Sequence, residues 1–289
     1  KSSSRLGFHL KIVDPKRVKG ALQLHKFSWV GSEKHFVDIP NIEQVNNLTI
    51  GRFGGNSSAG QYKNEDGCIV WSNEEQDWEF VVLLDAHNSA ESAELVINTI
   101  TEEEQNLTAI FNMPLPESFN QMDKYIVHIF QNPLFLASCR EIQGETACLI
   151  VLRKDKYVWW FSVGDCILHL FHPELAKMDQ FLLNQRNFYE WIGQVNTFEL
   201  DVPCYSTGRR ELRKGMNHLF LTTDGLTECP DGNFHNAIEI MKEFDNAKSH
   251  QDSVQNLLKE IEEKGVRDST TIISWVVNVE RNASEPSDL

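Results

Sequence analysis

The sequence predicts an α+β protein in which antiparallel β-sheets are layered with helices. Apolar segments of strand length recur along the chain, and several neighbouring ones are joined by short turns. Amphipathic segments with helical spacing lie in two groups between them. Strands with paired helices grouped between them are typical of helices that pack on antiparallel sheets.

One domain is the expected organisation of residues 1–289. The composition, 41% hydrophobic and 24% charged residues, is ordinary for a globular protein with a sizeable core. No internal repeat or low-complexity linker divides the chain, and we place the core of the domain at about 48–279.

The first strands of this core come before any helix. The segment 48–60 begins as a strand and becomes a Gly/Ser loop. "CIVW" at 68–71 and "WEFVVLLD" at 78–85 are predicted strands, which the acidic turn "SNEEQD" joins. The second of these is continuously apolar from Phe80 to Leu84 before its final aspartate, as expected for a buried strand.

Two helical stretches follow. "SAESAELVINTITEEE" at 89–104 has helical spacing, with Asn88 as its expected N-cap and Glu91 in the position of a capping box. The second stretch covers 116–142, and Pro133 is expected to break it.

The second half of the chain returns to strands. We expect strands at 146–152, 156–165, 166–171, 218–225 and 270–279, of which the first three form an antiparallel meander. Helices are predicted near 235–244 and 250–264. The polar, irregular segment 172–215 is interpreted as a flap-like insertion, and the tail 280–289 as disordered.

Charge and cysteine content narrow the partners and the compartment. A formal net charge of −15 without a basic stripe argues against a general nucleic-acid binder. No apolar run reaches the roughly 18 to 20 residues of a membrane span, so no membrane partner is expected. Six cysteines without a C-x-x-C pair, mostly inside apolar runs, are interpreted as reduced and structural, which favours the cytoplasm.

Acidic residues gather at the ends of the predicted strands. Three strands end in aspartate ("VVLLD", "FSVGD" and "LFLTTD"), and acidic residues also precede the strand at 68–71 and the last strand. These residues are Asp85, Asp165, Asp224, Glu65, Asp66 and Asp268. Each alone is most simply a turn residue, but converging carboxylates raise one another's pKa unless cations neutralise them. Oxygen ligands without a His/Cys cluster favour Mg²⁺ or Mn²⁺ over zinc.

The order of the motifs resembles a known enzyme family. "GQYKNEDG", "VVLLDAHNS", "QGETACLIVL", "FSVGDCIL", "LFLTTDGLTE" and "VRDSTTIISW" are similar, across about residues 50–278, to the motifs of the metal-dependent type 2C (PP2C, PPM) serine/threonine protein phosphatases. The resemblance implies a four-layer α/β/β/α sandwich with two antiparallel sheets. The compact single domain favours a divergent, bacterial-type member.

The resemblance also implies roles for individual residues. Two Mn²⁺ or Mg²⁺ ions would be held, with Asp85 bridging them and a bridging hydroxide attacking phosphorus. Asp224 and Asp268 would complete the first ion's ligands. The implied ligands of the second ion are Glu65, Asp66 and the backbone carbonyl of Ala86. His87 would protonate the leaving oxygen as a general acid, and Glu141 matches a third, weaker metal site.

Several positions depart from the family pattern. Gln61 lies where the family often has an arginine that binds the substrate phosphate, and Arg52 or Lys63 could supply the cation instead. Ala86 replaces a glycine of the D-G-H-G-G motif. Asp165 belongs to the G-D-S-R-like turn, where a structural or indirect role is expected.

Three functional hypotheses remain open on the sequence. The first is metal-dependent hydrolysis of phosphoserine and phosphothreonine in proteins, or of a small phosphorylated molecule. The second is a catalytically weak or inactive PP2C-fold module that binds or regulates a partner, which Gln61 favours. The third, an aspartyl-phosphate hydrolase, fits poorly because such enzymes place a second aspartate two positions after the first, where this chain has His87 and Leu226.

Overall fold

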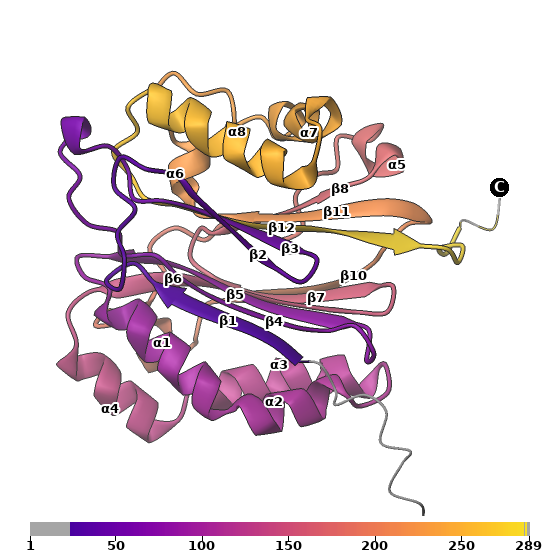
Figure 1. The fold of residues 1–289 in the computed structure, drawn as a ribbon. Coiled ribbons are helices and arrows are strands. Elements are labelled where there is room, and N and C mark those ends of the chain that lie inside the picture. The colour runs from indigo at the N-terminus through magenta and orange to yellow at the C-terminus, as the bar shows by residue number, and fades with distance from the viewer. Residues whose placement is uncertain (1–23, 286, 288–289) are drawn as a thin grey trace, which may run out of the picture.

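The computed structural model describes residues 24–285 and residue 287. Two antiparallel sheets stack face to face, and helices cover the outer face of each sheet (Figure 1). This arrangement confirms the predicted α+β class and the α/β/β/α sandwich. Residues 1–23, which the single-domain prediction includes, lie outside the described residues, as do 286, 288 and 289.

The first sheet has seven strands. They are β1 (Leu24–Val30), β4 (Gly67–Asn73), β5 (Trp78–His87), β6 (Glu145–Lys154), β7 (Tyr157–Val163), β9 (Ile192–Gly193) and β10 (Ser206–Glu211). Their order is β1-β4-β5-β6-β7-β10, and β9 pairs with one end of β6. In β5, Phe80, Val82 and Leu84 face the helices, whereas Val81 and Leu83 face the second sheet, because side chains alternate along a strand.

The second sheet has five strands in the order β2-β3-β12-β11-β8. They are β2 (Asn41–Val45), β3 (Leu48–Phe53), β8 (Ile167–Phe171), β11 (Gly215–Thr222) and β12 (Thr270–Val279). The chain therefore crosses between the sheets several times. Strands from the N-terminal and the C-terminal parts of the sequence, β3 and β12, lie side by side in it.

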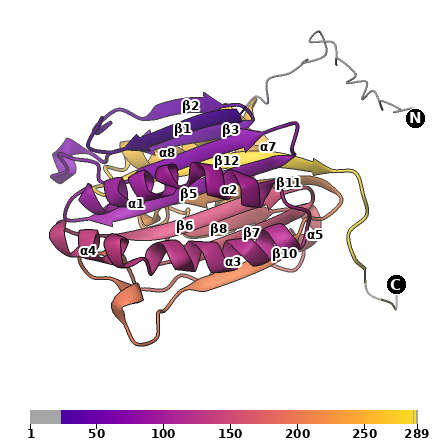
Figure 2. The same ribbon diagram turned by 90° about the horizontal axis from the view of Figure 1, so that it is seen from below.

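Helices form the two outer layers. They are α1 (Glu91–Glu102), α2 (Glu104–Phe111), α3 (Glu117–Phe130), α4 (Pro133–Glu141), α5 (Pro173–Ala176), α6 (Asp224–Thr227), α7 (Ala237–Asn246) and α8 (His250–Glu263). The first four cover the first sheet, as the view from below shows (Figure 2), and α7 and α8 cover the second. The break at Pro133 and the helices predicted near 235–244 and 250–264 are confirmed. Among the helices that the structure describes, none combines the length and apolar composition of a membrane span.

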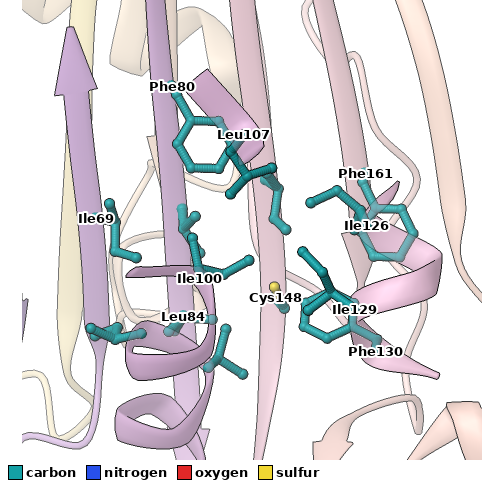
Figure 3. Close-up of a cluster of buried hydrophobic side chains, with 14 of the residues drawn as sticks. Ile69, Phe80, Leu84, Ile100, Leu107, Ile126, Ile129, Phe130, Cys148 and Phe161 are labelled. Atoms are coloured by element: carbon teal, nitrogen blue, oxygen red, sulfur yellow. The ribbon is translucent and has the colours of Figure 1, made fainter. Parts of the chain in front are cut away.

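Three apolar cores hold the layers together. In the outer one, Leu107 of α2 lies beside Phe80 of β5, and Ile126 and Phe130 of α3 lie on the side of Phe161 of β7 (Figure 3). A second core lies between the sheets and includes Trp275, and a third joins the second sheet to α7 and α8. Each large side chain that is removed from water contributes about 1.5 to 3 kcal/mol. The sheets are thereby fixed relative to each other, which fixes the residues at their shared edge.

The predicted meander is wrong in its third strand. β6 and β7 pair as expected, but β8 leaves the first sheet and pairs with β11 of the second. The chain crosses over at Gly164, which has a φ of +84° and would place a Cβ 2.5 Å from the Cβ of Ala147. Short apolar strands do not show in the sequence which of two sheets they join, so this crossing was missed.

The predicted N-cap of α1 is also wrong. α1 begins at Glu91, so Ala90 occupies the N-cap position and Asn88 lies two residues before it, with a φ of +73°. The Ser89 hydroxyl accepts the hydrogen bond from the backbone N–H of Glu91 at 3.2 Å. The Glu91 side chain accepts instead from the N–H of Gln143 at 2.8 Å, which ties α1 to the start of β6.

The segment 172–215 is partly regular. It contains α5, β9 and a 3₁₀ turn at Thr197–Glu199, and it returns to the first sheet as β10, which pairs with β7. In the tail, residues 280–285 contact this region: the N–H of Ser284 donates to Glu211 Oε2 at 3.1 Å.

Candidate metal centre

The strand ends that carry acidic residues meet at one edge of the stacked sheets. In the first sheet β5 ends and β4 begins there, because Gly67 pairs with Leu84. In the second sheet β11 ends and β12 begins there, because Thr222 pairs with Ile272. Antiparallel pairing thus brings strand starts and strand ends to the same place.

Three aspartates lie together at this edge. Asp85 comes from the end of β5, Asp165 from the turn between β7 and β8, and Asp224 from the first residue of α6. Each offers one carboxylate oxygen, and these oxygens all lie within 4.8 Å of one another. We call these three, with Asp66 and Asp268, the carboxylate group.

Asp66 joins the group from the start of β4. Its Oδ2 accepts a hydrogen bond from Thr271 Oγ1 of β12 at 2.7 Å and a longer one from Thr223 Oγ1 at 3.4 Å. Its backbone N–H donates to Asn64 Oδ1 at 2.9 Å, which fixes the turn before the strand. Thr271 lies in β12 of the second sheet and Thr223 directly follows β11, so Asp66 spans the gap between the sheets.

Burial and mutual repulsion perturb the pKa values of the group. Burial, followed by its acidic neighbours, raises the pKa of Asp85 well above its usual range. Burial and the charges of Asp268 and Asp224 do the same to the pKa of Asp66, although the Thr271 hydrogen bond partly offsets them. Burial and nearby aspartates raise the pKa of Asp224 to about 7. Converging carboxylates on this scale need a positive charge to stay ionised.

The unpartnered atoms of the group fit divalent cations. One carboxylate oxygen in each of four aspartates is buried and has no hydrogen-bond partner among the described residues. These are Asp66 Oδ1, Asp85 Oδ2, Asp165 Oδ1 and Asp224 Oδ1. A buried charge without a partner is strongly unfavourable, and hard oxygen donors are the ligands that Mg²⁺ and Mn²⁺ prefer. The donor set therefore suits these ions.

His87 and Glu65 border the carboxylate group. His87 ends β5, is half-buried, and lies close enough to Asp268 to lower the pKa of that carboxyl, against the larger raising effect of burial. Glu65 Oε1 accepts from Lys63 Nζ at 2.6 Å, and Lys63 Nζ also donates to the carbonyl of Asn88 at 2.8 Å.

Ala86 is compatible with its predicted place. It lies inside β5 with an extended backbone, so the glycine of the family motif is not needed there for a positive φ. Its side chain is buried on the helix-covered face of the first sheet.

Three other candidates, Glu141, Gln61 and Arg52, are not part of the carboxylate group. Glu141 is exposed at the end of α4, and Gln61 is a half-buried loop residue whose N–H donates to the carbonyl of Asn56. Arg52 is 5% exposed, and its guanidinium lies 4.7 Å from the ring centroid of Phe36 and 5.0 Å from that of Trp29. This enclosure does not support a phosphate contact by Arg52.

Two residues have a larger place in the site than the sequence indicated. For Asp165 the sequence predicts an indirect role, but its carboxylate lies in the group. Its strand ending "FSVGD" matches the other two endings, and this match could have indicated that Asp165 joins them. Arg186, from the segment 172–215, contacts Asp165, and no spacing in the sequence relates the two.

Comparison with known proteins supports the fold directly. No protein-family model matches the sequence, and no curated protein sequence matches it. Solved structures match over most of the chain. An arginine-to-alanine variant of a bacterial serine phosphatase has a TM-score of 0.59 at 16% identity and covers 90% of this chain and 100% of its own. The serine/threonine phosphatase Stp1 from Staphylococcus aureus has a TM-score of 0.57 at 15% identity, covering 94% of this chain and 99% of its own.

The chain has the PP2C-like phosphatase fold. A third match is RsbX, solved in complex with magnesium, with a TM-score of 0.53 at 14% identity over 83% of this chain and 100% of its own. The PP2C-like fold and the resemblance seen in the motifs therefore agree. At these identities the comparisons establish the fold, and the activity is a matter of the residues at the sheet edge.

Proposed function

We propose that this protein is a Mn²⁺- or Mg²⁺-dependent phosphatase that hydrolyses phosphoserine and phosphothreonine in proteins. The observation that carries the proposal is the set of four buried, unpartnered carboxylate oxygens at one edge of the two sheets. The fold is shared with the serine/threonine phosphatase Stp1 and with RsbX, which was solved in complex with magnesium.

The carboxylate group would hold two ions. In this proposal Asp85 would serve both ions, Asp224 and Asp268 would serve one, and Asp66, Glu65 and the carbonyl of Ala86 would serve the other. One carboxylate oxygen of Asp165 lies within 4.8 Å of those of Asp85 and Asp224, so we add Asp165 to the proposed ligands. The third, weaker ion at Glu141 stays a prediction; Glu141 is exposed at the end of α4. Bound ions would supply activation of water and neutralisation of the phosphate charge.

His87 is the proposed proton donor to the leaving oxygen. It stands at the end of the strand that carries Asp85, on the border of the carboxylate group. In this proposal an N–H of its imidazole would donate to an oxygen of a substrate held over the group. The chain's own part in the reaction is to hold the ions, orient the phosphoester and deliver this proton.

A non-catalytic binding or regulatory module is the second candidate. Gln61 favours it, because the site lacks the usual arginine at that position. Against it stand the raised pKa values of the carboxylate group, an unfavourable arrangement to keep without ions.

The free cysteines support a reducing compartment. All six are unpaired and most are buried, so we place the activity in the cytoplasm.

Hydrolysis of p-nitrophenyl phosphate and of a phosphothreonine peptide tests the proposal. We expect turnover with Mn²⁺ or Mg²⁺, none with EDTA, and a loss of about two orders of magnitude or more in Asp85→Asn and Asp224→Asn, since each removes an ion ligand. Activity on the phosphate ester but not on the peptide would indicate a small-molecule substrate. A folded wild type that binds Mn²⁺ but hydrolyses neither would favour the binding module.

A further inference from the structure

Arg186 is a cation placed directly against the carboxylate group. Its Nε donates to the backbone carbonyl of Asp165 at 3.1 Å, and its Nη2 lies 3.9 Å from Asp165 Oδ2. Its charge also lowers the pKa of Asp224, against the dominant raising effect of burial. The guanidinium is therefore held at the border of the proposed ion site.

The Nη atoms of this guanidinium could exchange their present partner for a ligand. Nη2 donates to Glu228 Oε1 at 2.9 Å, and the Glu228 side chain is 52% exposed, so this ion pair can be replaced without burying an unpaired charge. Nη1 has no hydrogen-bond partner among residues 24–285. The guanidinium lies 4.8 Å from the centroid of the Phe188 ring, which supports its plane.

Arg52 and Lys63, the two cations named from the sequence, are less suited to binding phosphate. Arg52 is enclosed by aromatic rings, as described above. Lys63 already donates to Glu65 and to the carbonyl of Asn88, and an ammonium is a point charge without the paired donors of a guanidinium. Among these three, Arg186 alone combines contact with the carboxylate group and donors that remain available.

We propose that Arg186 binds the phosphate group of the substrate, in the role that the family gives to an arginine at the position of Gln61. This inference rests on the proposed phosphatase function. A phosphate monoester placed over the ions would accept hydrogen bonds from Nη1 and Nη2 and displace Glu228 from the guanidinium. Charge-assisted pairs of this bidentate kind are strong and directional.

The segment 172–215 would thus contribute to substrate binding directly. Phe188 and Tyr189, 55% and 85% exposed, follow Arg186 in this segment and would lie beside the residue that carries the phosphate. Arg186 would bind the phosphate and the aspartates would bind the ions, so phosphate affinity and ion affinity can be tested separately.

Binding of inorganic phosphate to the Mn²⁺-loaded protein, measured by calorimetry, is the first test. We expect Arg186→Ala to weaken phosphate binding about tenfold or more, the effect of losing roughly 1.4 kcal/mol, with unchanged Mn²⁺ affinity. Arg186→Lys should be intermediate. Introducing Gln61→Arg into the Arg186→Ala variant should restore part of the lost affinity. Arg210→Ala, which removes an arginine of the same segment that bonds Gln180, is the matched control and should leave phosphate binding unchanged.

Kinetics on p-nitrophenyl phosphate give the second readout. Arg186→Ala should raise KM and the inhibition constant of phosphate together. Unchanged phosphate binding in Arg186→Ala, or an equal loss in Arg210→Ala, would overturn the assignment and leave Arg186 as a structural tether. A wild type that binds phosphate through Arg186 but has no turnover would support Arg186 while refuting the phosphatase function. Absence of both phosphate binding and turnover would refute both.

Discussion

Asp224 shows how a single side chain can oppose stability and serve function. Its folded pKa of about 7 lies above the value of about 3.9 in an unfolded chain. The folded state therefore binds this proton more tightly, and the stability that comes from it is full below about pH 4 and lost as the pH rises through 7. Metal-free protein should lose stability over this range, and Mn²⁺ should restore it.

The substitution Asp224→Asn separates the two effects. We expect the metal-free variant to be more stable than the wild type at pH 8, by about 1 kcal/mol or 2 to 4 °C in melting temperature, because one repelling charge is gone. At pH 4 the difference should vanish, while activity is lost at every pH. Thermal unfolding in EDTA from pH 4 to 8 measures this, and a wild type that gains stability towards pH 8 would contradict it.

At the residue scale, the meeting of Asp85, Asp165 and Asp224 could be predicted from local signals. The acidic strand ends could be recognised because each aspartate follows its own apolar run. Arg52 could not be placed, because the rings that enclose it come from Trp29 and Phe36, which precede it in other elements. Arg186 could not be placed either, because it lies in an irregular segment and its partner Asp165 is 21 positions earlier in the chain.

Among the elements, the turn between α4 and β6 supports the end of β5. Gly144 in this turn has a φ of +84°, and a Cβ there would lie 2.1 Å from the backbone carbonyl oxygen of His87. Gly144→Ala must therefore displace the strand end that carries Asp85 and His87. We expect a loss of stability of about 2 kcal/mol or more and a fall in turnover of about tenfold or more.

Gly215→Ala is the matched control for that change. Gly215 also has a positive φ, +101°, but its Cβ would meet only His172 Nε2 at 3.8 Å, at the opposite end of β11 from the carboxylate group. It should show the backbone strain, about 1 kcal/mol, with normal turnover per folded molecule. Equal effects of the two substitutions on turnover would show that the contact with His87 is not important.

Strand and helix positions were largely predictable because apolar periodicity is a local property. The assignment of strands to sheets was not. β8 follows β7 after a short turn, which favours pairing between them, yet it lies in the other sheet. In β5, Val81 and Leu83 face the second sheet. The sequence shows that side chains alternate along this strand, but it does not show where the second sheet lies, so it does not tell which face points towards that sheet.

In the whole molecule, the candidate site is divided between the two sheets. Asp66 and Asp85 come from strand ends of the first sheet, Asp224 and Asp268 from strand ends of the second, and Asp165 from the turn that connects the two sheets. Ions bound between them should stabilise the complete fold. At about 100 times the dissociation constant, Mn²⁺ should add about 2.7 kcal/mol, or roughly 5 to 10 °C in melting temperature. Asp85→Asn should lose most of this shift, and an unchanged shift would place Mn²⁺ elsewhere.

The hydrogen bond between Thr271 and Asp66 crosses from one sheet to the other at the place where the ions would bind. A chain in which only one sheet has formed offers at most part of the ligand set. If the proposed function holds, ion binding would depend on assembly: the protein would become able to cleave phosphoesters only after both sheets have docked, and misassembled copies would stay inactive.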